Sequence, residues 1–343
     1  MCNMAAYTGK KAAAPILFRM IKSQEFLDAG HYTGIAIMDN GKICMRKVCG
    51  TAEDLLKRYP EILNFPGNCG IIHSRTPGID NDEWSQPFFA YDDEEMVMCG
   101  NGGNGRFGLP DIKDDYCEFL RQGKHFRTAV REKAGSCPML PDGHFIHVTE
   151  FKTFVAKRET AENELLRHGL KKMFCRYPSE IAALAMRTAE PGAISVLRNN
   201  MPMMLGRKDG DFYLATSAVA LESEKISWID SLPYCSVTTV SADSIQSEVV
   251  EEFAHTFRSW QPLPEIYREF DTLFDAGNDY CFDQLRRIAW QHWDQETETG
   301  FANQITYEYL RSRLADGSLE CFSVETPASH KGGKCFQNRF RKK

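Results

Sequence analysis

The order of apolar and polar residues predicts a chain in which short strands and helices are mixed over the first 245 residues. Apolar positions at helical spacing predict a helix over 11–27. Two β-rich runs on either side of Asp39-Asn40-Gly41 predict a hairpin over 33–48. Further short strands are expected at 69–74, 95–99, 193–198, 203–206, 211–216 and 235–240.

Helical patterns dominate the rest of the chain. One is expected over 111–121, and two more within 160–187 on either side of Tyr177-Pro178. Beyond residue 246, helices are expected over 247–259, 265–275, 280–293 and 303–315. The end of the chain, 331–343, holds six Lys and Arg residues and no acidic residue, which is typical of a solvated basic tail. We therefore expect a mixed body over 2–245, a helical C-terminal extension over 246–330 and a basic tail over 331–343.

Composition places the chain among ordinary globular proteins, with 43% hydrophobic residues, 26% charged residues and a formal net charge of −6. No apolar run approaches the roughly 18 residues of a membrane span, and the first twenty residues lack the pattern of a cleaved signal peptide. Twelve cysteines are scattered without a C-x-x-C pair, which favours reduced thiols in the cytoplasm over a disulfide framework.

A glycine cluster, Gly100-x-Gly102-x-x-Gly105, matches the spacing of a dinucleotide-binding loop. That motif needs a helix to begin within it, and Arg-Phe-Gly-Leu-Pro follows here instead. The sequence therefore favours a tight turn, and we expect no cofactor. His144-x-x-His147 lacks acidic or cysteine partners at ligand spacing, so no metal site is expected either.

Candidate chemistry begins at Cys2, which follows the initiator methionine. Removal of Met1 would place a thiol and a free α-amine on one residue. Because an α-amine has a pKa of about 7.7–8.0, it can accept the thiol proton near neutrality without help from a histidine. A cysteine in second position, taken alone, is usually an accident.

Two other places complement such a nucleophile. Arg75 ends the run Gly70-Ile-Ile-His-Ser-Arg, and a guanidinium there can hold a carboxylate with two parallel hydrogen bonds. Asn101-Gly102 can form an oxyanion hole, in which an amide side chain and a glycine N–H stabilise developing negative charge. In isolation these would be a surface arginine and a turn.

Together with TGIAIMDNGK and the run RNNMPMMLGRKDGDFYLATSAVAL over 198–221, these motifs resemble the class II glutamine amidotransferases, which are N-terminal-nucleophile hydrolases. The nearest likeness is to the glutaminase domain of glucosamine-6-phosphate synthase. The resemblance covers about 2–245 and implies an α+β fold, the four-layer αββα sandwich, followed here by a helical C-terminal appendage.

The resemblance also implies roles for individual residues. Cys2 would attack the glutamine amide to form a thioester, and Asn101 and Gly102 would form the oxyanion hole. Arg75 would bind the substrate α-carboxylate, with Thr76 beside it, and Glu150 would bind the α-amine. Departures from the family include Thr76-Pro77-Gly78, which replaces the run that shapes the glutamine pocket.

Several alternatives stay open. The chain is too short beyond 246 for the synthase's sugar-isomerase domains, so ammonia would pass to a separate acceptor protein. Alternatively, the protein is an N-terminal-cysteine amidase for another amide, or a non-catalytic regulatory protein with the same fold. The C-terminal helices could cover the body, dock the acceptor or form a homo-oligomer. A membrane or nucleic-acid partner is not expected.

Overall fold

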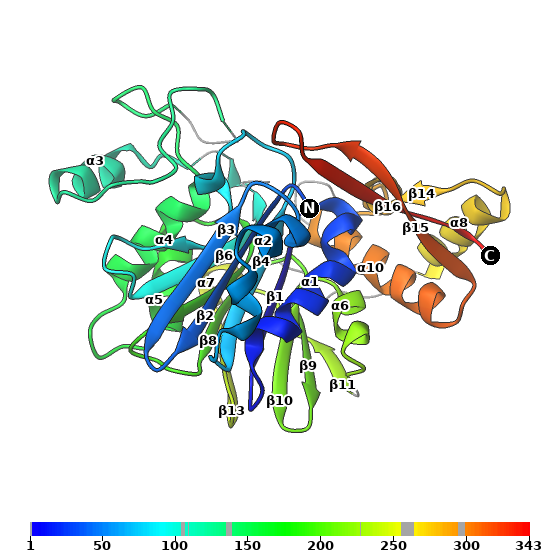
Figure 1. Cartoon of the computed structure of the whole chain (residues 1–343), viewed down its shortest axis with the longest axis horizontal. Coiled ribbons are helices and arrows are strands. Elements are labelled where there is room, and N and C mark those ends of the chain that lie inside the picture. The colour runs from blue at the N-terminus through cyan, green and yellow to red at the C-terminus, as the bar shows by residue number, and fades with distance from the viewer. Residues whose placement is uncertain are drawn as a thin grey trace.

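Two antiparallel β-sheets packed face to face form the main body of the molecule (Figure 1). The computed structural model describes residues 2–103, 107–108, 110–134, 139–226, 228–254, 264–293 and 299–343. The first sheet has seven strands in the order β11-β9-β10-β1-β4-β2-β3, and the second has six in the order β13-β12-β8-β7-β6-β5. Fully buried side chains such as Met4, Ile71, Val97 and Leu184 fill the space between the sheets.

The strand bounds are as follows. The first sheet consists of β1 (Asn3–Thr8), β2 (Tyr32–Asp39), β3 (Lys42–Val48), β4 (Cys69–Arg75), β9 (Met204–Lys208), β10 (Asp211–Ala215) and β11 (Trp228–Ser231). The second consists of β5 (Phe88–Phe89), β6 (Met96–Gly103), β7 (Glu180–Arg187), β8 (Ile194–Arg198), β12 (Ser236–Ser241) and β13 (Ser244–Val249). Short 3-10 helices lie at Pro60–Asn64 and Asp82–Trp84.

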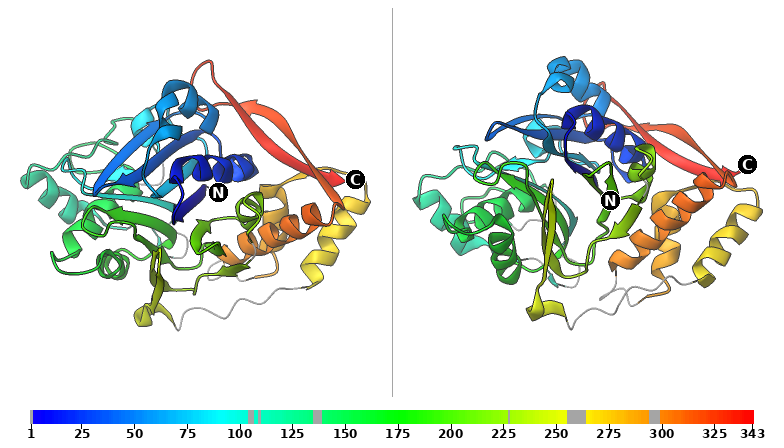
Figure 2. Two further views of the ribbon diagram at one scale, coloured as in Figure 1. Left: turned by 60° about the horizontal axis from the view of Figure 1, so that its bottom comes forward. Right: turned by 90° about the horizontal axis from the view of Figure 1, so that it is seen from below.

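Helices cover the outer face of each sheet, as the rotated views in Figure 2 show. The first sheet packs against α1 (Ala13–Asp28), α2 (Ala52–Arg58) and α6 (Ala218–Ser223). The second packs against α4 (Val148–Glu159) and α5 (Leu166–Arg176), and α3 (Lys113–Arg121) packs on α4, where its Phe119 meets Phe154. The predicted four-layer αββα sandwich is confirmed.

None of the helices within the described ranges is long and apolar enough to cross a membrane.

The hairpin predicted over 33–48 is present as β2 and β3. Its turn places Asn40 at φ 48° and Gly41 at φ 73°, the left-handed conformation that these two residue types adopt most readily. Local turn chemistry therefore sets the register, in which Asp39 pairs with Lys42.

The second helix expected within 160–187 is wrong, because residues 180–187 form strand β7 at the centre of the second sheet. Its sequence, EIAALAMR, is rich in alanine and can be read as helical. In the fold β7 pairs with β6 on one side and β8 on the other, and every residue except Arg187 is buried. Long-range pairing outweighs the local helix preference here.

The C-terminal part has its own apolar core. It contains α7 (Glu251–Ala254), α8 (Pro264–Asp275), α9 (Phe282–Trp290), α10 (Thr299–Ala315) and a sheet of β14 (Tyr280–Cys281), β16 (Lys334–Lys342) and β15 (Leu319–Pro327). Buried Phe270, Phe282 and Leu310 belong to this core, which also takes in Leu27 of α1. The helices expected near 265–275, 280–293 and 303–315 are present, while 255–263 of the helix expected over 247–259 lie outside the described residues.

The basic tail over 331–343 is not a solvated coil, which corrects the expectation. Most of it forms β16, paired along its whole length with β15. Phe340 is fully buried, and Arg339 and Arg341 form ion pairs with Asp279 and Glu320 at 2.6 and 2.5 Å. The expected boundary at residue 245 also falls inside β13, so the second sheet extends the body to residue 249.

Candidate active site

Pairing of β1 with β4 places the candidate nucleophile beside the candidate carboxylate-binding arginine. Met4 pairs with His73 in this antiparallel ladder, so continuation of the register by two residues sets Cys2 opposite Arg75. Residues opposite each other in a β-ladder have their side chains on the same face of the sheet, and along one strand the side chains alternate between the two faces. The side chains of Cys2, Met4, His73 and Arg75 therefore belong to the face turned toward the second sheet.

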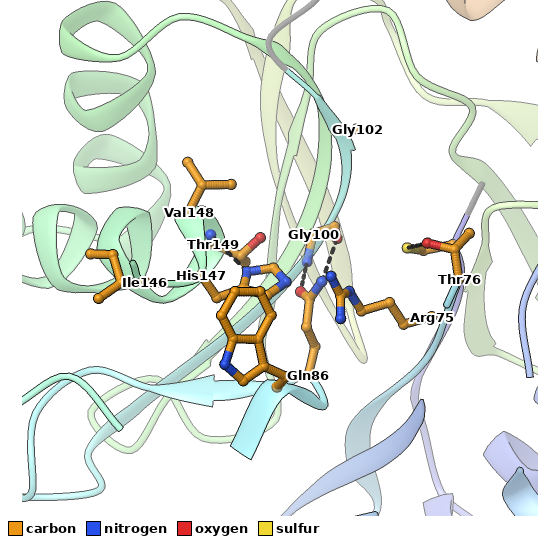
Figure 3. A pocket seen from close by; sticks show the side chains of 11 residues that line it. Arg75, Thr76, Gln86, Gly100, Gly102, Ile146, His147, Val148 and Thr149 are labelled. Atoms are coloured by element: carbon orange, nitrogen blue, oxygen red, sulfur yellow. Dashed lines mark hydrogen bonds between the residues drawn. The ribbon is translucent and has the colours of Figure 1, made fainter. Parts of the chain in front are cut away.

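A cavity of about 140 Å³ opens at this place, between the ends of β1, β4 and β6 and the start of α4 (Figure 3). Four predicted site residues line it: Cys2, Arg75, Thr76 and Gly102. The Thr76 hydroxyl lies 4.0 Å from the Cys2 sulfur. The remaining lining residues are Trp84, Gln86, Gly100, Ile146, His147, Val148 and Thr149.

The Cys2 thiol ionises more readily than an ordinary thiol. Burial by itself raises its pKa, but interaction with His73 and the charges of the N-terminal amine and of Arg75 outweigh that effect and lower the pKa to about 6. His73 is fully buried, and neither ring nitrogen has a hydrogen-bond partner of normal geometry among the residues that the structure describes. Its influence on the thiol is therefore that of a close polar neighbour rather than of a well-formed hydrogen bond.

Arg75 lines the cavity, and no ion pair to it is found in the described part of the chain. Its guanidinium carbon lies 5.0 Å from the Tyr32 ring centre and 5.5 Å from that of Trp84, so the planar group packs against two aromatic rings. Its Nη1 atom is buried and has no hydrogen-bond acceptor among the described residues. A buried donor without a partner is costly, so this site favours a ligand that carries an anionic acceptor.

The segment with the predicted oxyanion donors is held rigidly. Gln86 bonds both backbone groups of Gly100, accepting from its N–H at 2.7 Å and donating to its carbonyl at 3.0 Å. Gly102 has φ 142°, and an added Cβ would lie 1.8 Å from the Glu180 carbonyl oxygen, so only glycine fits there. Both glycines lie in β6, and Gly105 of the glycine pattern lies outside the described residues.

Asn101 is 3% exposed, and its amide nitrogen has no hydrogen-bond partner in the described part of the chain. The Cys99 sulfur, two residues before it, lies 3.7 Å from the Met4 sulfur across the sheet interface. Side chains alternate between the two faces of a strand, so Asn101 points the same way as Cys99. It therefore points toward the face of the first sheet that carries Cys2. It lines a smaller cavity of about 20 Å³ that shares Gly100 and Gly102 with the main one.

Comparison with known proteins finds relatives among glutamine-dependent aminotransferases. The chain is 26% identical over 296 residues to the glutamine–fructose-6-phosphate aminotransferase of Thermococcus kodakarensis, an alignment that covers 80% of this chain and 45% of that protein. The corresponding aminotransferase of Pyrococcus horikoshii is 22% identical over 222 residues. The chain is therefore similar in sequence to part of these glutamine-dependent aminotransferases. No family model matches it.

The solved structures show the same fold. The glutamine phosphoribosylpyrophosphate amidotransferase of B. subtilis superposes with a TM-score of 0.57 at 16% identity, over 73% of this chain and 49% of that one. The predicted resemblance to amidotransferases is confirmed by these relatives. The chain spans 45% and 33% of the length of the two aminotransferases named above.

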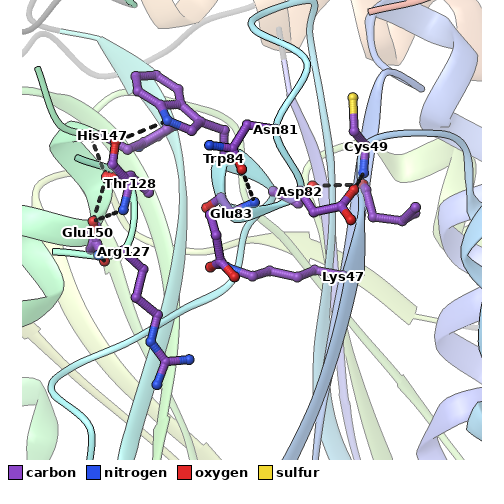
Figure 4. Close-up of polar contacts among 12 residues, drawn as sticks. Lys47, Cys49, Asn81, Asp82, Glu83, Trp84, Arg127, Thr128, His147 and Glu150 are labelled. Carbon is purple, nitrogen blue, oxygen red and sulfur yellow. Dashed lines mark hydrogen bonds and ion pairs between the residues drawn. The ribbon is translucent and has the colours of Figure 1, made fainter. Parts of the chain in front are cut away.

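Within this amidotransferase fold, Glu150 does not fit its predicted place at the substrate amine. Its carboxylate is 2% exposed and accepts hydrogen bonds from the backbone N–H groups of Arg127 and Thr128, at 2.8 and 3.1 Å, and from the Thr128 hydroxyl (Figure 4). Burial raises the pKa of Glu150. It is absent from the cavity lining, because its position in α4 turns it toward the 127–128 loop. Glu150 therefore supports the wall of the pocket rather than lining it.

His147 is a pocket residue that the sequence did not indicate. It caps α4, where its Nδ1 accepts the N–H of Thr149 at 3.1 Å. Burial and nearby positive charges lower its pKa well below the usual value, which keeps the ring neutral. With Nδ1 accepting, the ring proton sits on Nε2, so His147 can donate a hydrogen bond but carries no charge.

Two further site residues were missed from the sequence: Gln86, which lines the cavity, and His73, which acts on the Cys2 thiol but does not line it. His73 could have been found from strand alternation, since it is two residues before Arg75 and shares its face. Gln86 precedes a proline in a loop and had no local signal, because its role depends on Gly100, fourteen residues further on. None of the described residues forms a group of three or more metal-binding side chains.

Proposed function

We propose that this chain hydrolyses the primary amide of a glutamine-like carboxylic acid through a thioester on Cys2, releasing ammonia. The observation that carries the proposal is the juxtaposition, in one cavity, of the Cys2 thiol, whose pKa is lowered, and the Arg75 guanidinium, whose Nη1 has no hydrogen-bond acceptor among the described residues. The kinship with glutamine-dependent aminotransferases supports it. The unit responsible would be the sandwich over residues 2–249.

The proposed first step is acylation. Once Met1 is removed, the α-amine of Cys2 takes the thiol proton, and the thiolate attacks the amide carbon. Asn101 Nδ2–H and the Gly102 N–H donate to the oxygen as it becomes negative. The carbon–nitrogen bond then breaks, and the amine proton passes to the leaving nitrogen, which departs as ammonia.

The second step is hydrolysis. Water, deprotonated by the same α-amine, attacks the thioester carbon, and the carbon–sulfur bond breaks to give a carboxylic acid and the free thiol. Arg75 holds the far carboxylate of the substrate through both steps, which fixes the amide at Cys2. The ammonia would pass to a separate acceptor protein or to solvent.

The direct test is ammonia release from a panel of carboxylate-bearing primary amides, glutamine included, by protein whose mass shows that Met1 is gone. Cys2→Ala should abolish release while the thermal unfolding midpoint stays within a few degrees of wild type. Cys2→Ser, which keeps the shape of the side chain, should retain only trace activity. Wild-type turnover by Cys2→Ala, or by protein that fully retains Met1, would rule the mechanism out.

A further inference from the structure

We infer that the amide cleaved at Cys2 belongs to a carboxylic acid without a free α-ammonium group, such as glutaramate, which is glutamine without its α-amine. This inference rests on the proposed function and specifies its substrate class. It follows from the balance of charges among the described residues around the cavity, which offer a cation for a carboxylate and no anion for an ammonium.

The cationic side is Arg75. Its Nη1 is buried without an acceptor, so a substrate carboxylate supplies the partner that the described protein lacks. Tyr32 and Trp84 fix the plane of the guanidinium, which restricts where that carboxylate can bind. The substrate is thereby anchored at its acidic end.

No aspartate or glutamate is among the described residues that line this cavity. Glu150, the one carboxylate expected there, is occupied by the backbone N–H groups of Arg127 and Thr128. Glu180 lines the smaller neighbouring cavity and not this one. His147 stays neutral and its Nε2–H can only donate a hydrogen bond, so this side chain cannot balance a positive charge.

The wall opposite Arg75 is also unfavourable for an ammonium group. It is the N-terminal turn of α4, where Val148 and Thr149 line the cavity beside Ile146. A helix N-terminus carries a partial positive charge and repels cations, while Val148 and Ile146 present apolar surface without acceptors. An ammonium group here would lose water and gain no counter-ion.

Glutamine carries its ammonium and carboxylate groups on the same carbon. With the carboxylate on Arg75, the ammonium would lie close to the guanidinium and the α4 terminus, at a cost that glutaramate avoids. The cavity, at about 140 Å³, is smaller than the roughly 300–1,000 Å³ common for ligand pockets. It therefore suits an unsubstituted acid of glutamine's length better than an acylated glutamine.

The test compares kcat/KM for glutaramate and for L-glutamine on the Met1-processed protein. We expect glutaramate to be preferred by at least tenfold. Val148→Asp would place a carboxylate in the wall at the α4 terminus, and we expect it to raise the glutamine-to-glutaramate ratio at least tenfold. Val148→Asn is the matched control, because asparagine has the size of aspartate but no charge. It should leave the glutamine-to-glutaramate ratio within about twofold of wild type.

A wild-type preference for glutamine would overturn the inference while leaving the proposed function intact. If Glu180→Gln then removed that preference, Glu180 would be the missing counter-ion. An equal shift in Val148→Asp and Val148→Asn would also count against it, because volume and not charge would be responsible. Failure to release ammonia from either amide, with both at saturating concentration, would instead reject the proposed function itself.

Discussion

The Tyr307 hydroxyl donates a hydrogen bond of 3.0 Å to the side-chain oxygen of Asn3, the residue next to Cys2. Asn3 is fully buried and its amide nitrogen donates to the Gln24 carbonyl at 2.8 Å. Tyr307 belongs to α10 and stacks on Phe282, with ring centres 4.3 Å apart. The C-terminal part of the chain therefore anchors the start of β1, next to Cys2.

Tyr307→Phe should weaken both stability and catalysis. The change leaves the buried Asn3 oxygen without its donor, which costs about 1–3 kcal/mol of unfolding free energy. Because Asn3 also sets the position of Cys2, kcat for amide hydrolysis should fall while KM changes little. Denaturant unfolding and steady-state kinetics on the same preparation measure the two effects.

Tyr309→Phe is the matched control. Tyr309 lies on the same helix and donates to Asp271 at 2.9 Å, within the C-terminal part and away from Cys2. The Tyr309→Phe variant should be less stable than wild type, but its folded fraction should keep the wild-type kcat. An equal kcat for the Tyr307 and Tyr309 variants would argue against a positioning role for Tyr307.

The low pKa of the Cys2 thiol should be visible in its rate of alkylation. Since the thiolate is the reactive form and the thiol pKa is about 6, the rate at Cys2 should fall as pH drops through 6 and reach a plateau above 7. Iodoacetamide labelling, quantified at Cys2 by peptide mass, gives the midpoint.

His73→Ala tests the cause of that shift. Burial alone raises the thiol pKa, so loss of His73 should move the midpoint upward, toward or beyond the value of about 8.5 for an unperturbed cysteine. Arg75 remains in this variant and keeps part of the effect. An unchanged midpoint would show that His73 does not control the thiol.

Asn101→Ala should lower kcat by about 10²–10³-fold, because removal of one oxyanion donor typically has an effect of that size. The Asn101 amide nitrogen has no partner in the described protein, so folding loses no hydrogen bond from that atom. Asn101→Asp preserves the size but replaces the donor with a negative acceptor, and it should be at least as inactive. Activity close to wild type in either variant would place the oxyanion elsewhere.

Glu25 should make the protein less stable as pH rises. Burial raises its pKa to about 7 from 4.5, and its Oε1 atom has no partner among the described residues. The folded state then binds a proton more tightly than the unfolded state, so stability falls between pH 4.5 and 7 and stays lower above 7. The loss is on the order of 3 kcal/mol at 1.36 kcal/mol per pKa unit.

Glu25→Gln removes this dependence. The neutral amide resembles the protonated acid in shape, so the variant should be more stable than wild type at pH 8 and about equal to it at pH 4.5. Urea unfolding at the two pH values measures the difference. A parallel loss of stability with pH in both proteins would assign the effect to another group.

Much of the sandwich was predictable because its signals are local. Asn40 and Gly41 favour the left-handed conformation that the hairpin turn requires. Helix α1 can be predicted from the spacing of apolar residues within its own 16 residues. Strand β7 was missed because its alanine-rich sequence suits a helix, and only its pairing with β6 and β8 decides for a strand. The tail over 331–343 was missed for the same reason, since β16 is fixed by pairing with β15.

The candidate site divides in the same way. The sequence by itself identified the candidate residues near a chain end or a strand end, Cys2, Arg75 and the Asn101-Gly102 pair, and the fold brings them to two neighbouring cavities. The tertiary structure alone decided that Glu150 turns to the 127–128 loop, and that Val148 takes the place at the cavity wall. A side chain's type is fixed locally, but its charge partners come from segments far apart in sequence, so only the folded chain sets the pocket's charge balance.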